Sequence, residues 1–290
     1  MFLTNIGKAS LQVLALFFVI CGGASSSLLA PSQQQYTQRI VALSPHAVEL
    51  LFSLGVGDRI IATTEYADFP EAALQIPRVG GYHGISLERI LELQPDLVIV
   101  WKGGNSDSDI KRLKRMGLNV YESYPQKLEQ VAEELLQLGV LVGKEKRARE
   151  LSDRFHRRLH KLRSIYGSKK PVRFFYQIWA QPLRAMAAGS WINELVTGCG
   201  GVNILDGSYP DYPEVSLESI LLMAPAAILQ PTQHGADSST GINWRDWPEI
   251  PAVKNNHIYS INGDILHRFS LRILDGMQET CSKLERVRAH

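Results

Sequence analysis

The feature that most constrains the fold is an internal repeat. Residues 84–101 (GISLERILELQPDLVIVW) match residues 214–231 (EVSLESILLMAPAAILQP) at a constant offset of 130 (214 − 84). In both segments a serine precedes an acidic residue, an apolar helix face, a proline and an apolar strand. A repeat of this length indicates two homologous lobes. Each strand is apolar on both faces, which is typical of a central strand in a parallel sheet.

Strands and helices alternate on both sides of the repeat. Predicted strands cover residues 39–43, 59–63, 96–101, 118–121, 172–177, 226–229 and 257–261. Predicted helices cover residues 46–54, 86–93, 107–116, 128–142, 191–196, 216–223 and 270–284. This spacing is typical of βαβ units, so we predict an α/β fold of two similar lobes with parallel central sheets.

Residues 144–166 (KEKRARELSDRFHRRLHKLRSIY) interrupt the alternation, because they contain neither Gly nor Pro. Their apolar residues recur at the spacing of one helix face, which predicts a single long helix between the lobes. Its Arg and Lys residues fit either a polyanion site or a solvated outer face. The formal net charge of +2 favours the outer face and argues against nucleic-acid binding. The apolar positions are Leu151, Phe155, Leu159, Leu162 and Ile165.

The N-terminus has the pattern of a secretory signal. Lys8 precedes an apolar run at residues 11–20, and small residues follow at 22–27. Cleavage after Ala24 or Ala30 would leave a protein exported to the periplasm; a buried N-terminal helix is the alternative. Cys21 follows Ile20, whereas lipidation requires a small residue before the cysteine, so we expect Cys21 to leave with the signal.

These patterns predict five consecutive segments. They are a signal peptide at 1–30, a flexible lead-in at 31–37, an N-terminal lobe at 38–143, a connecting helix at 144–167 and a C-terminal lobe at 168–290. After signal removal two cysteines remain, Cys199 and Cys281. An exported protein with two cysteines is expected to form one disulfide, with two buried thiols as the alternative.

The sequence has none of the common catalytic motifs, such as a nucleophile elbow, a P-loop or a zinc-protease helix, so we predict that it is not an enzyme. His156 and His160 have a zinc-compatible spacing, but no third ligand is near and the helix is basic. We therefore predict no metal there. A metal-capturing protein remains an open alternative, because four histidines lie at predicted strand ends or loops: His46, His83, His234 and His267.

Aromatic residues are concentrated at the ends of predicted strands and in the loops between the predicted elements. Such loops line the ligand crevice of an open α/β sheet, and aromatic rings there form a broad apolar wall for a flat ligand. A place in the core or at a cap is the alternative for each, and we favour the core for Trp244 and Trp247. The loop aromatics are Tyr66, Tyr82, Trp101, Trp179 and Tyr212.

Three stretches carry a family resemblance: residues 44–70 (SPHAVELLFSLGVGDRIIATTEYADFP), residues 78–105 (RVGGYHGISLERILELQPDLVIVWKGGN) and residues 198–205 (GCGGVNIL). The chain resembles the periplasmic substrate-binding proteins of importers for siderophores, haem and cobalamin, over about residues 38–290. W-x-G-G-N after the PDLVI strand is the most specific shared piece. The resemblance implies two Rossmann-like lobes joined by one rigid long helix, and capture of cobalamin or a related corrinoid between them.

The resemblance also implies roles for individual residues. It pairs Cys199 with Cys281 and places Asp264, Ile265, Leu266, His267 and Arg268 in a further ligand-binding loop. Ile265, Leu266, His267 and Arg184 stand where aromatic residues would be expected, so haem, a ferric siderophore or an altered corrinoid remain alternative ligands. An envelope hydrolase or metalloenzyme is a third alternative. The corrinoid-lining positions are Tyr66, Tyr82, Trp101 and Tyr212.

Glu88 and Glu218 occupy equivalent places in the repeat, two residues after the serines Ser86 and Ser216. Acidic residues in a first helical turn complement the helix dipole by about 0.3–1 kcal/mol, which alone accounts for both. The resemblance implies a second role, in which the two glutamates dock onto arginines of the permease dimer of an inner-membrane ABC importer.

Overall fold

The computed structural model describes residues 36–81, 83–207, 209–233, 236–237 and 242–289. The expected signal segment at 1–30, with Cys21, lies outside the described residues. Within the part that is described, no helix has the length and apolar character needed to cross a membrane.

The first sheet has four parallel strands in the order β2-β1-β5-β6. Its strands are β1 (Ile40–Ala42), β2 (Ile60–Thr63), β5 (Leu97–Trp101) and β6 (Val120–Ser123). The accompanying helices are α1 (Pro45–Leu54), α2 (Leu87–Glu92), α3 (Asp107–Arg115) and α4 (Glu129–Val142). A short hairpin, β3 (Gly80–Gly81) and β4 (Gly84–Ile85), precedes α2.

Both faces of this sheet are buried, as the apolar strands predict. Ile40 and Ala42 lie in one core cluster, which includes residues of α1 and α4. Val41 points to the opposite face and lies in a second cluster, which includes residues of α2 and α3. Side chains alternate between the two faces of a strand, so three consecutive apolar residues require helices on both sides.

The second sheet has a parallel centre in the order β12-β10-β7-β9, confirming the predicted parallel strands. Two antiparallel strands that the sequence did not predict extend it, since β8 pairs with β7 and β11 pairs with β10. Its strands are β7 (Val172–Ala180), β8 (Leu183–Ala185), β9 (Gly201–Asn203), β10 (Ala227–Gln233), β11 (Ala236–Asp237) and β12 (Ile258–Asn262). Its helices are α6 (Trp191–Thr197), α7 (Leu217–Met223), α8 (Pro251–Lys254), α9 (Gly263–Leu266) and α10 (Ile273–Arg288).

The internal repeat is visible in the backbone as well as in the sequence. The hydroxyl of Ser86 caps α2, and the hydroxyl of Ser216 caps α7 in the same way. Gln94 and Ala224, again 130 residues apart, both adopt a left-handed conformation, with φ of 46° and 48°. This conformation is uncommon for residues other than glycine, so its recurrence at equivalent positions supports two homologous lobes.

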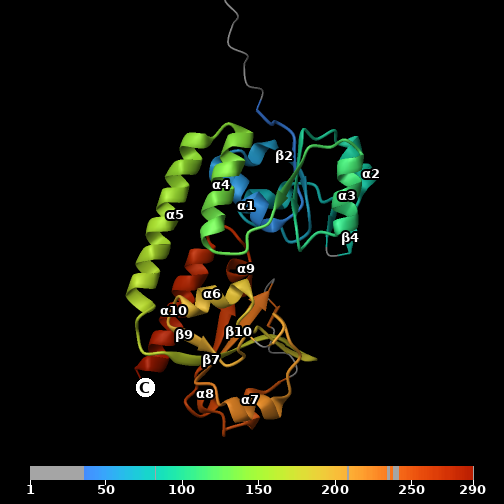
Figure 1. Cartoon of the computed structure of the whole chain (residues 1–290). Helices are drawn as coiled ribbons and strands as arrows, with labels where there is room; N and C mark the ends of the chain where they lie inside the picture. Colours follow the sequence, from blue (N-terminus) through green and yellow to red (C-terminus); the bar gives the residue numbers. More distant parts are fainter. Residues whose placement is uncertain (1–35, 82, 208, 234–235, 238–241, 290) are drawn as a thin grey trace, which may run out of the picture. The chain divides into compact units, whose positions relative to one another are not determined.

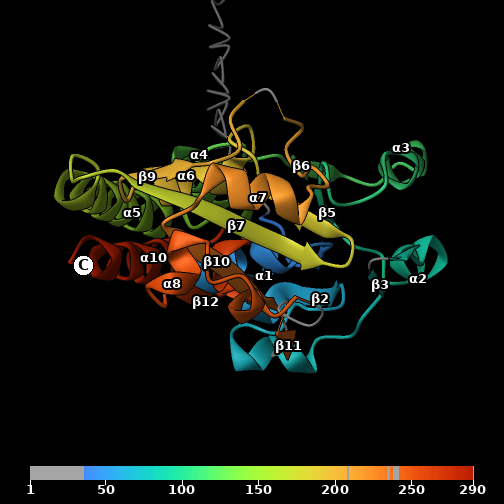
Figure 2. The ribbon, with the colours of Figure 1, turned by 90° about the horizontal axis from the view of Figure 1, so that it is seen from below.

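The predicted long helix is α5 (Glu145–Tyr166), which runs beside α4 and leads into β7 (Figure 1). Its buried stripe matches the prediction, with one exception: Ile165, in the last turn, is 42% exposed. Gly139 of α4 allows a close approach, because a Cβ there would lie 2.4 Å from the Cβ of Ala148. On another side α5 contacts α10, which also packs on β12 (Figure 2).

A disulfide joins Cys199, just after α6, to Cys281 of α10, with 4.9 Å between the Cα atoms. Both residues are fully buried. This confirms the expected pairing and excludes the alternative of two free thiols. The predicted core positions of two tryptophans are confirmed too. Trp244 is buried, with its indole N–H donating to Gln177 Oε1 at 2.7 Å, and Trp247 packs against the same cluster.

Candidate functional site

The W-x-G-G-N segment (residues 101–105) forms a tight turn at the carboxyl end of β5, held by the side chain of Asn105. The Trp101 amide donates to Asn105 Oδ1 at 2.7 Å, and Asn105 Nδ2 donates to the Leu43 carbonyl at 3.0 Å. Gly103 has a φ of +98°, and a Cβ on Gly104 would lie 1.9 Å from the Trp101 ring. Each of these residue types is therefore required by the local geometry. Together they fix the half-buried Trp101 ring at the edge of the sheet.

His46, at the start of α1, lies behind this ring. Its imidazole meets Trp101 edge-on at 5.4 Å between centroids, and Phe269 of the C-terminal lobe at 6.5 Å. Its Nε2 forms a 2.8 Å hydrogen bond with Ser123 Oγ at the end of β6. Burial, helped by the positive charge of Arg268, lowers the pKa of His46 to about 3. His46 is therefore a neutral structural support for Trp101 at physiological pH.

Tyr66 follows β2, an edge strand that β1 separates from β5, and lies on the surface. It has a left-handed backbone with φ of 64°, and its side chain is 51% exposed. This places a large exposed ring at the same sheet edge as Trp101. Tyr82, the second aromatic expected in this lobe, lies outside the described residues.

The C-terminal lobe contributes aromatic residues to the same region. Phe269 packs against Trp191 with 4.0 Å between ring centroids, and its contact with His46 joins the two lobes. Tyr212 is 40% exposed, and its hydroxyl accepts a 3.0 Å hydrogen bond from Ser190 Oγ. Burial raises the pKa of Tyr212, which keeps its phenol neutral.

The predicted ligand-binding loop after β12 in fact begins as the short helix α9, whose cap is Asn262, and its residues have mixed roles. Asp264, Ile265 and His267 are half-buried, whereas Leu266 has no exposed surface. Leu266 therefore has no surface with which to contact a ligand in this structure. His267 Nε2 bonds to the Tyr176 hydroxyl at 2.7 Å. Burial lowers the pKa of His267 to about 4, although the Asp264 charge acts in the opposite direction.

Arg268 belongs to an ion-pair network that joins the lobes. Its Nη1 donates to Glu49 Oε1 of α1 at 3.1 Å and to Asp68 Oδ1 at 2.6 Å. Arg272 Nε donates to the other Glu49 oxygen at 2.9 Å, and its guanidinium lies 3.6 Å from the Phe69 ring centroid. Glu49 is buried, and its two oxygens accept hydrogen bonds from Arg268 and Arg272 of the other lobe. These arginines compensate its buried charge. The network fixes the buried guanidinium of Arg268 against Glu49 of α1.

The histidines do not form a metal site among the residues that the structure describes, where no group of three or more potential His, Cys, Asp or Glu ligands converges. His156 and His160 are exposed on α5, as the sequence suggested. His46 and His267 are each engaged in a hydrogen bond, and His234 lies outside the described residues.

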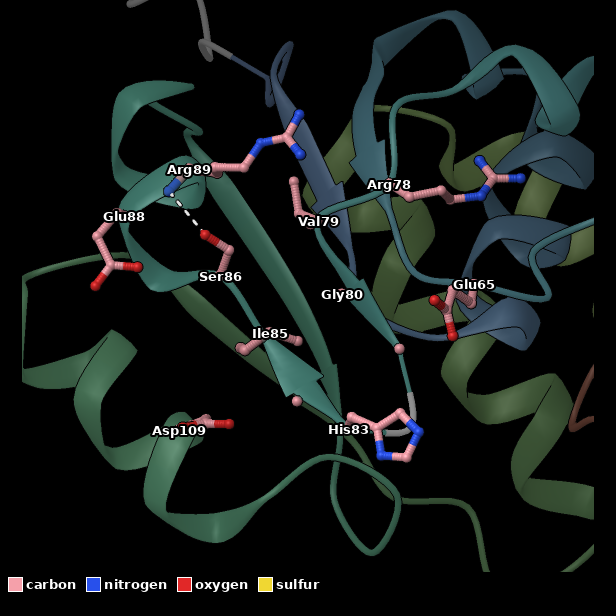
Figure 3. Close-up of a pocket in the computed structure, with 12 residues that line it drawn as sticks. Glu65, Arg78, Val79, Gly80, His83, Ile85, Ser86, Glu88, Arg89 and Asp109 are labelled. Carbon is pink, nitrogen blue, oxygen red and sulfur yellow. Dashed lines mark hydrogen bonds between the residues drawn. The ribbon is translucent and has the colours of Figure 1, made fainter.

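Glu88 and Glu218 are exposed in the first turns of α2 and α7. Hydrogen bonds from its own backbone amide and from Ser216 lower the pKa of Glu218. Glu88 also borders a surface pocket of about 740 Å³, whose wall includes Glu65, Arg78 and Asp109 (Figure 3). In this view Glu88 points outward from α2, away from Arg78.

Comparison with known proteins identifies the family. The model of the periplasmic binding protein family matches residues 40–265. The chain is 35% identical over 249 residues to a vitamin B12-binding protein of Vibrio cholerae, covering 86% of this chain and 89% of that protein. It is 37% identical over 252 residues to a vitamin B12-binding protein of Vibrio campbellii, covering 87% and 90%. The chain belongs to the periplasmic binding protein family.

The fold agrees with this assignment. The crystal structure of the periplasmic vitamin B12-binding protein of Vibrio cholerae matches with a TM-score of 0.80 and 34% identity, over 88% of this chain and 99% of that one. A periplasmic haem-binding protein in complex with two haems matches with a TM-score of 0.78 at 19% identity, which shows a shared fold.

The sequence did not reveal which residues support the site. Glu49 lies on an otherwise apolar stretch of a helix in this binding protein, and a lone acid among buried residues is a recognisable signal for a buried ion pair. Its partner Arg272 is 223 residues away, and no local pattern connects the two. Glu134 of α4 is buried too, but it follows the exposed Glu133, so the sequence carries no signal that distinguishes the two.

Proposed function

We propose that this periplasmic binding protein captures cobalamin or a related corrinoid between its lobes and delivers it to the permease dimer of an inner-membrane ABC importer. The lobes would comprise residues 38–143 and 168–290, joined by α5. The observation that carries the proposal is the fixed Trp101 ring at the carboxyl edge of the first sheet, with the exposed Tyr66 at the same edge and the exposed Tyr212 contributed by the other lobe. The names of the vitamin B12-binding relatives support the same ligand.

Aromatic walls suit a corrin because the macrocycle is broad and largely apolar, while its edge carries amides. The polar residues beside the rings include Asp264 and Arg268. Arg268 is held by three carboxylates, so its buried charge is compensated while its position is fixed.

A carrier without catalytic activity fits the residues at the site. Ser123 and His46 form a serine–histidine pair, but Ser123 has no exposed surface and its hydroxyl cannot reach a substrate. A hydrolase would require an accessible nucleophile next to its base. The pair instead supports Trp101 from behind.

We propose that the protein is exported by the signal at residues 1–30 and works in the periplasm. The mature chain should begin between about residues 22 and 31, which intact-mass measurement of exported protein can determine. A retained, diacylated Cys21 would contradict this part of the proposal.

Delivery would use the exposed Glu88 and Glu218, one on each lobe. Exposed charges control the encounter rate and register of a complex more than ligand affinity. The double variant Glu88→Ala, Glu218→Ala should therefore bind ligand as the parent does and dock poorly onto its importer. Full uptake by that variant would leave the two glutamates as helix-start charges only.

The ligand is tested by incubating the purified protein with cyanocobalamin, haemin or ferric siderophores and recording visible spectra after desalting. We expect the corrinoid bands to be retained. Trp101→Ala and Tyr66→Ala should each weaken binding by about 1–3 kcal/mol, the range for a lost buried hydrophobic contact. Retention of haemin without cobalamin would identify the alternative ligand, and retention of neither would refute the proposal.

A further inference from the structure

Arg184 of β8 has no side-chain partner among the residues that the structure describes. No hydrogen bond, ion pair or ring contact within the described part of the chain involves its side chain, and its Nε is buried without an acceptor. Arg268, by contrast, is matched by three carboxylates. A buried N–H without an acceptor is unfavourable, so its persistence in a folded protein requires an explanation. The residue as a whole is half-buried, so part of it remains accessible from the surface.

The strand register places Arg184 beside the proposed ligand site. Trp179, next to the carboxyl end of β7, pairs directly with Arg184, so the two side chains share one face of the hairpin. On the other side of β8, Arg184 forms a bridge with Glu214. The segment before Glu214 continues along β8, because the amides of Ala185 and Ala187 donate to the carbonyls of Pro213 and Asp211, and this pairing brings Tyr212 close to the strand of Arg184.

The aromatic side chains in this region are exposed and leave surface that a ligand could cover. Trp179 is 54% exposed and Tyr212 is 40% exposed, so both rings present accessible surface near Arg184. Glu214 lies opposite Arg184 but is exposed, and no ion pair between them occurs in the described residues. Aromatic surface together with an unpaired arginine is suited to a ligand that is apolar over its face and carries acceptor oxygens at its rim.

We infer that Arg184, flanked by Trp179, is a ligand-binding residue that donates hydrogen bonds to an acceptor oxygen at the edge of a corrinoid lying against Tyr212. The inference rests on the proposed function and adds the recognition of a polar group to it. A corrinoid offers two sources of such an oxygen, the carbonyls of its peripheral amides and the phosphodiester of its nucleotide loop. An arginine fork suits both, since its donors are fixed in a plane.

The two sources are separated by comparing cyanocobalamin with dicyanocobinamide, which keeps the amides and lacks the nucleotide loop. Equilibrium titrations would use the parent, Arg184→Gln, Arg184→Lys and the control Arg154→Gln. Arg154 is an exposed arginine of α5 with no ion pair in the described residues. Hydrogen bonds to charged groups are strong enough that Arg184→Gln should weaken cyanocobalamin binding about ten- to a hundredfold.

The pattern across the two ligands identifies the oxygen. An unchanged affinity of Arg184→Gln for cobinamide assigns the phosphodiester, and an equal loss for both ligands assigns a ring amide. Arg184→Lys should recover only part of the loss, because it keeps the charge without the planar fork. Unfolding midpoints without ligand should equal or exceed that of the parent, since the substitution removes an unsatisfied group.

One result would refute the role of Arg184, and another would refute the proposed ligand. If Arg184→Gln, folded as the parent is, binds both corrinoids with the affinity of the parent and of Arg154→Gln, Arg184 does not contact the ligand. If the parent itself binds neither corrinoid, the proposed function fails, and with it the ligand assigned to Arg184.

Discussion

Replacing Glu134 by glutamine should remove most of a pH dependence of stability. Glu134 of α4 is 4% exposed, and neither carboxylate oxygen has a hydrogen-bond partner in the described part of the structure. Burial raises the pKa of Glu134 from 4.5 to about 7; the nearby Ser123 hydroxyl offsets part of this shift without reaching hydrogen-bond geometry. Burial and the Glu134 charge in turn raise the pKa of Tyr121.

The sign follows from proton binding. A carboxyl group whose pKa is higher in the folded state binds more protons there than in the unfolded chain, so stability falls as pH rises from about 4.5 to about 7. A shift of that size corresponds to about 3 kcal/mol. The parent should lose this amount between pH 4 and pH 8, and Glu134→Gln should not. At pH 8 the variant should therefore be the more stable protein.

Urea unfolding at pH 4, 6 and 8 measures the effect, with free energies compared between the parent and Glu134→Gln at each pH. Other groups titrate equally in both proteins and cancel in the difference. Glu133→Gln is the matched control, because Glu133 is exposed on the same helix and should show no such change. A parent-to-variant difference that is constant across this range would refute the assignment of a raised pKa to Glu134.

Three further outcomes follow from packing and charge. Reducing Cys199–Cys281 should lower the free energy of unfolding by about 4 kcal/mol, measured by denaturation with and without reductant, because the bond closes a loop with a sequence separation of 82. Gly104→Ala should displace the Trp101 ring, lowering stability by about 1–3 kcal/mol and weakening ligand binding in the same titration. Glu49→Ala should cost about 3–5 kcal/mol in urea unfolding, since it leaves buried arginine charge uncompensated; a variant as stable as the parent would contradict the network's role.

Much of the fold follows from local sequence. Ser86 and Ser216 mark the starts of α2 and α7 because a serine hydroxyl caps the first free amide groups, and both caps are present. The apolar stripe of α5 is correct up to Leu162, and only the last turn turns its Ile165 to solvent. Such signals depend only on residues that are close in the sequence, so the sequence alone is sufficient to predict these helices.

Elements whose existence depends on distant partners were missed. Strand β8 follows the turn at Pro182 and has only three residues, so it lacks a detectable alternation; it exists because β7 continues past Gln177 to Ala180 and pairs with it. Gly201 begins β9, although the Gly200–Gly201 pair predicts only a turn.

The residues of the site likewise fall into those that local sequence predicts and those that depend on distant partners. Tyr66, Trp101 and Tyr212 were predicted from a local signal, aromatic residues at strand ends and in loops. Tyr66 and Tyr212 are exposed and Trp101 is half-buried, and their contact with a ligand stays a prediction. The supports of the site, from His46–Ser123 to Glu49–Arg272, join residues up to 223 positions apart. Only the tertiary fold brings them together.

A crystal structure of the protein with cyanocobalamin tests the central claim most directly, because it shows the ligand and its contacts at once. We predict the corrin ring between the two lobes, with heavy atoms of Trp101 and Tyr212 within about 4 Å of it, the distance of apolar contact. A corrinoid bound elsewhere, such as in the pocket beside Glu88, with Trp101 left bare, would contradict the account.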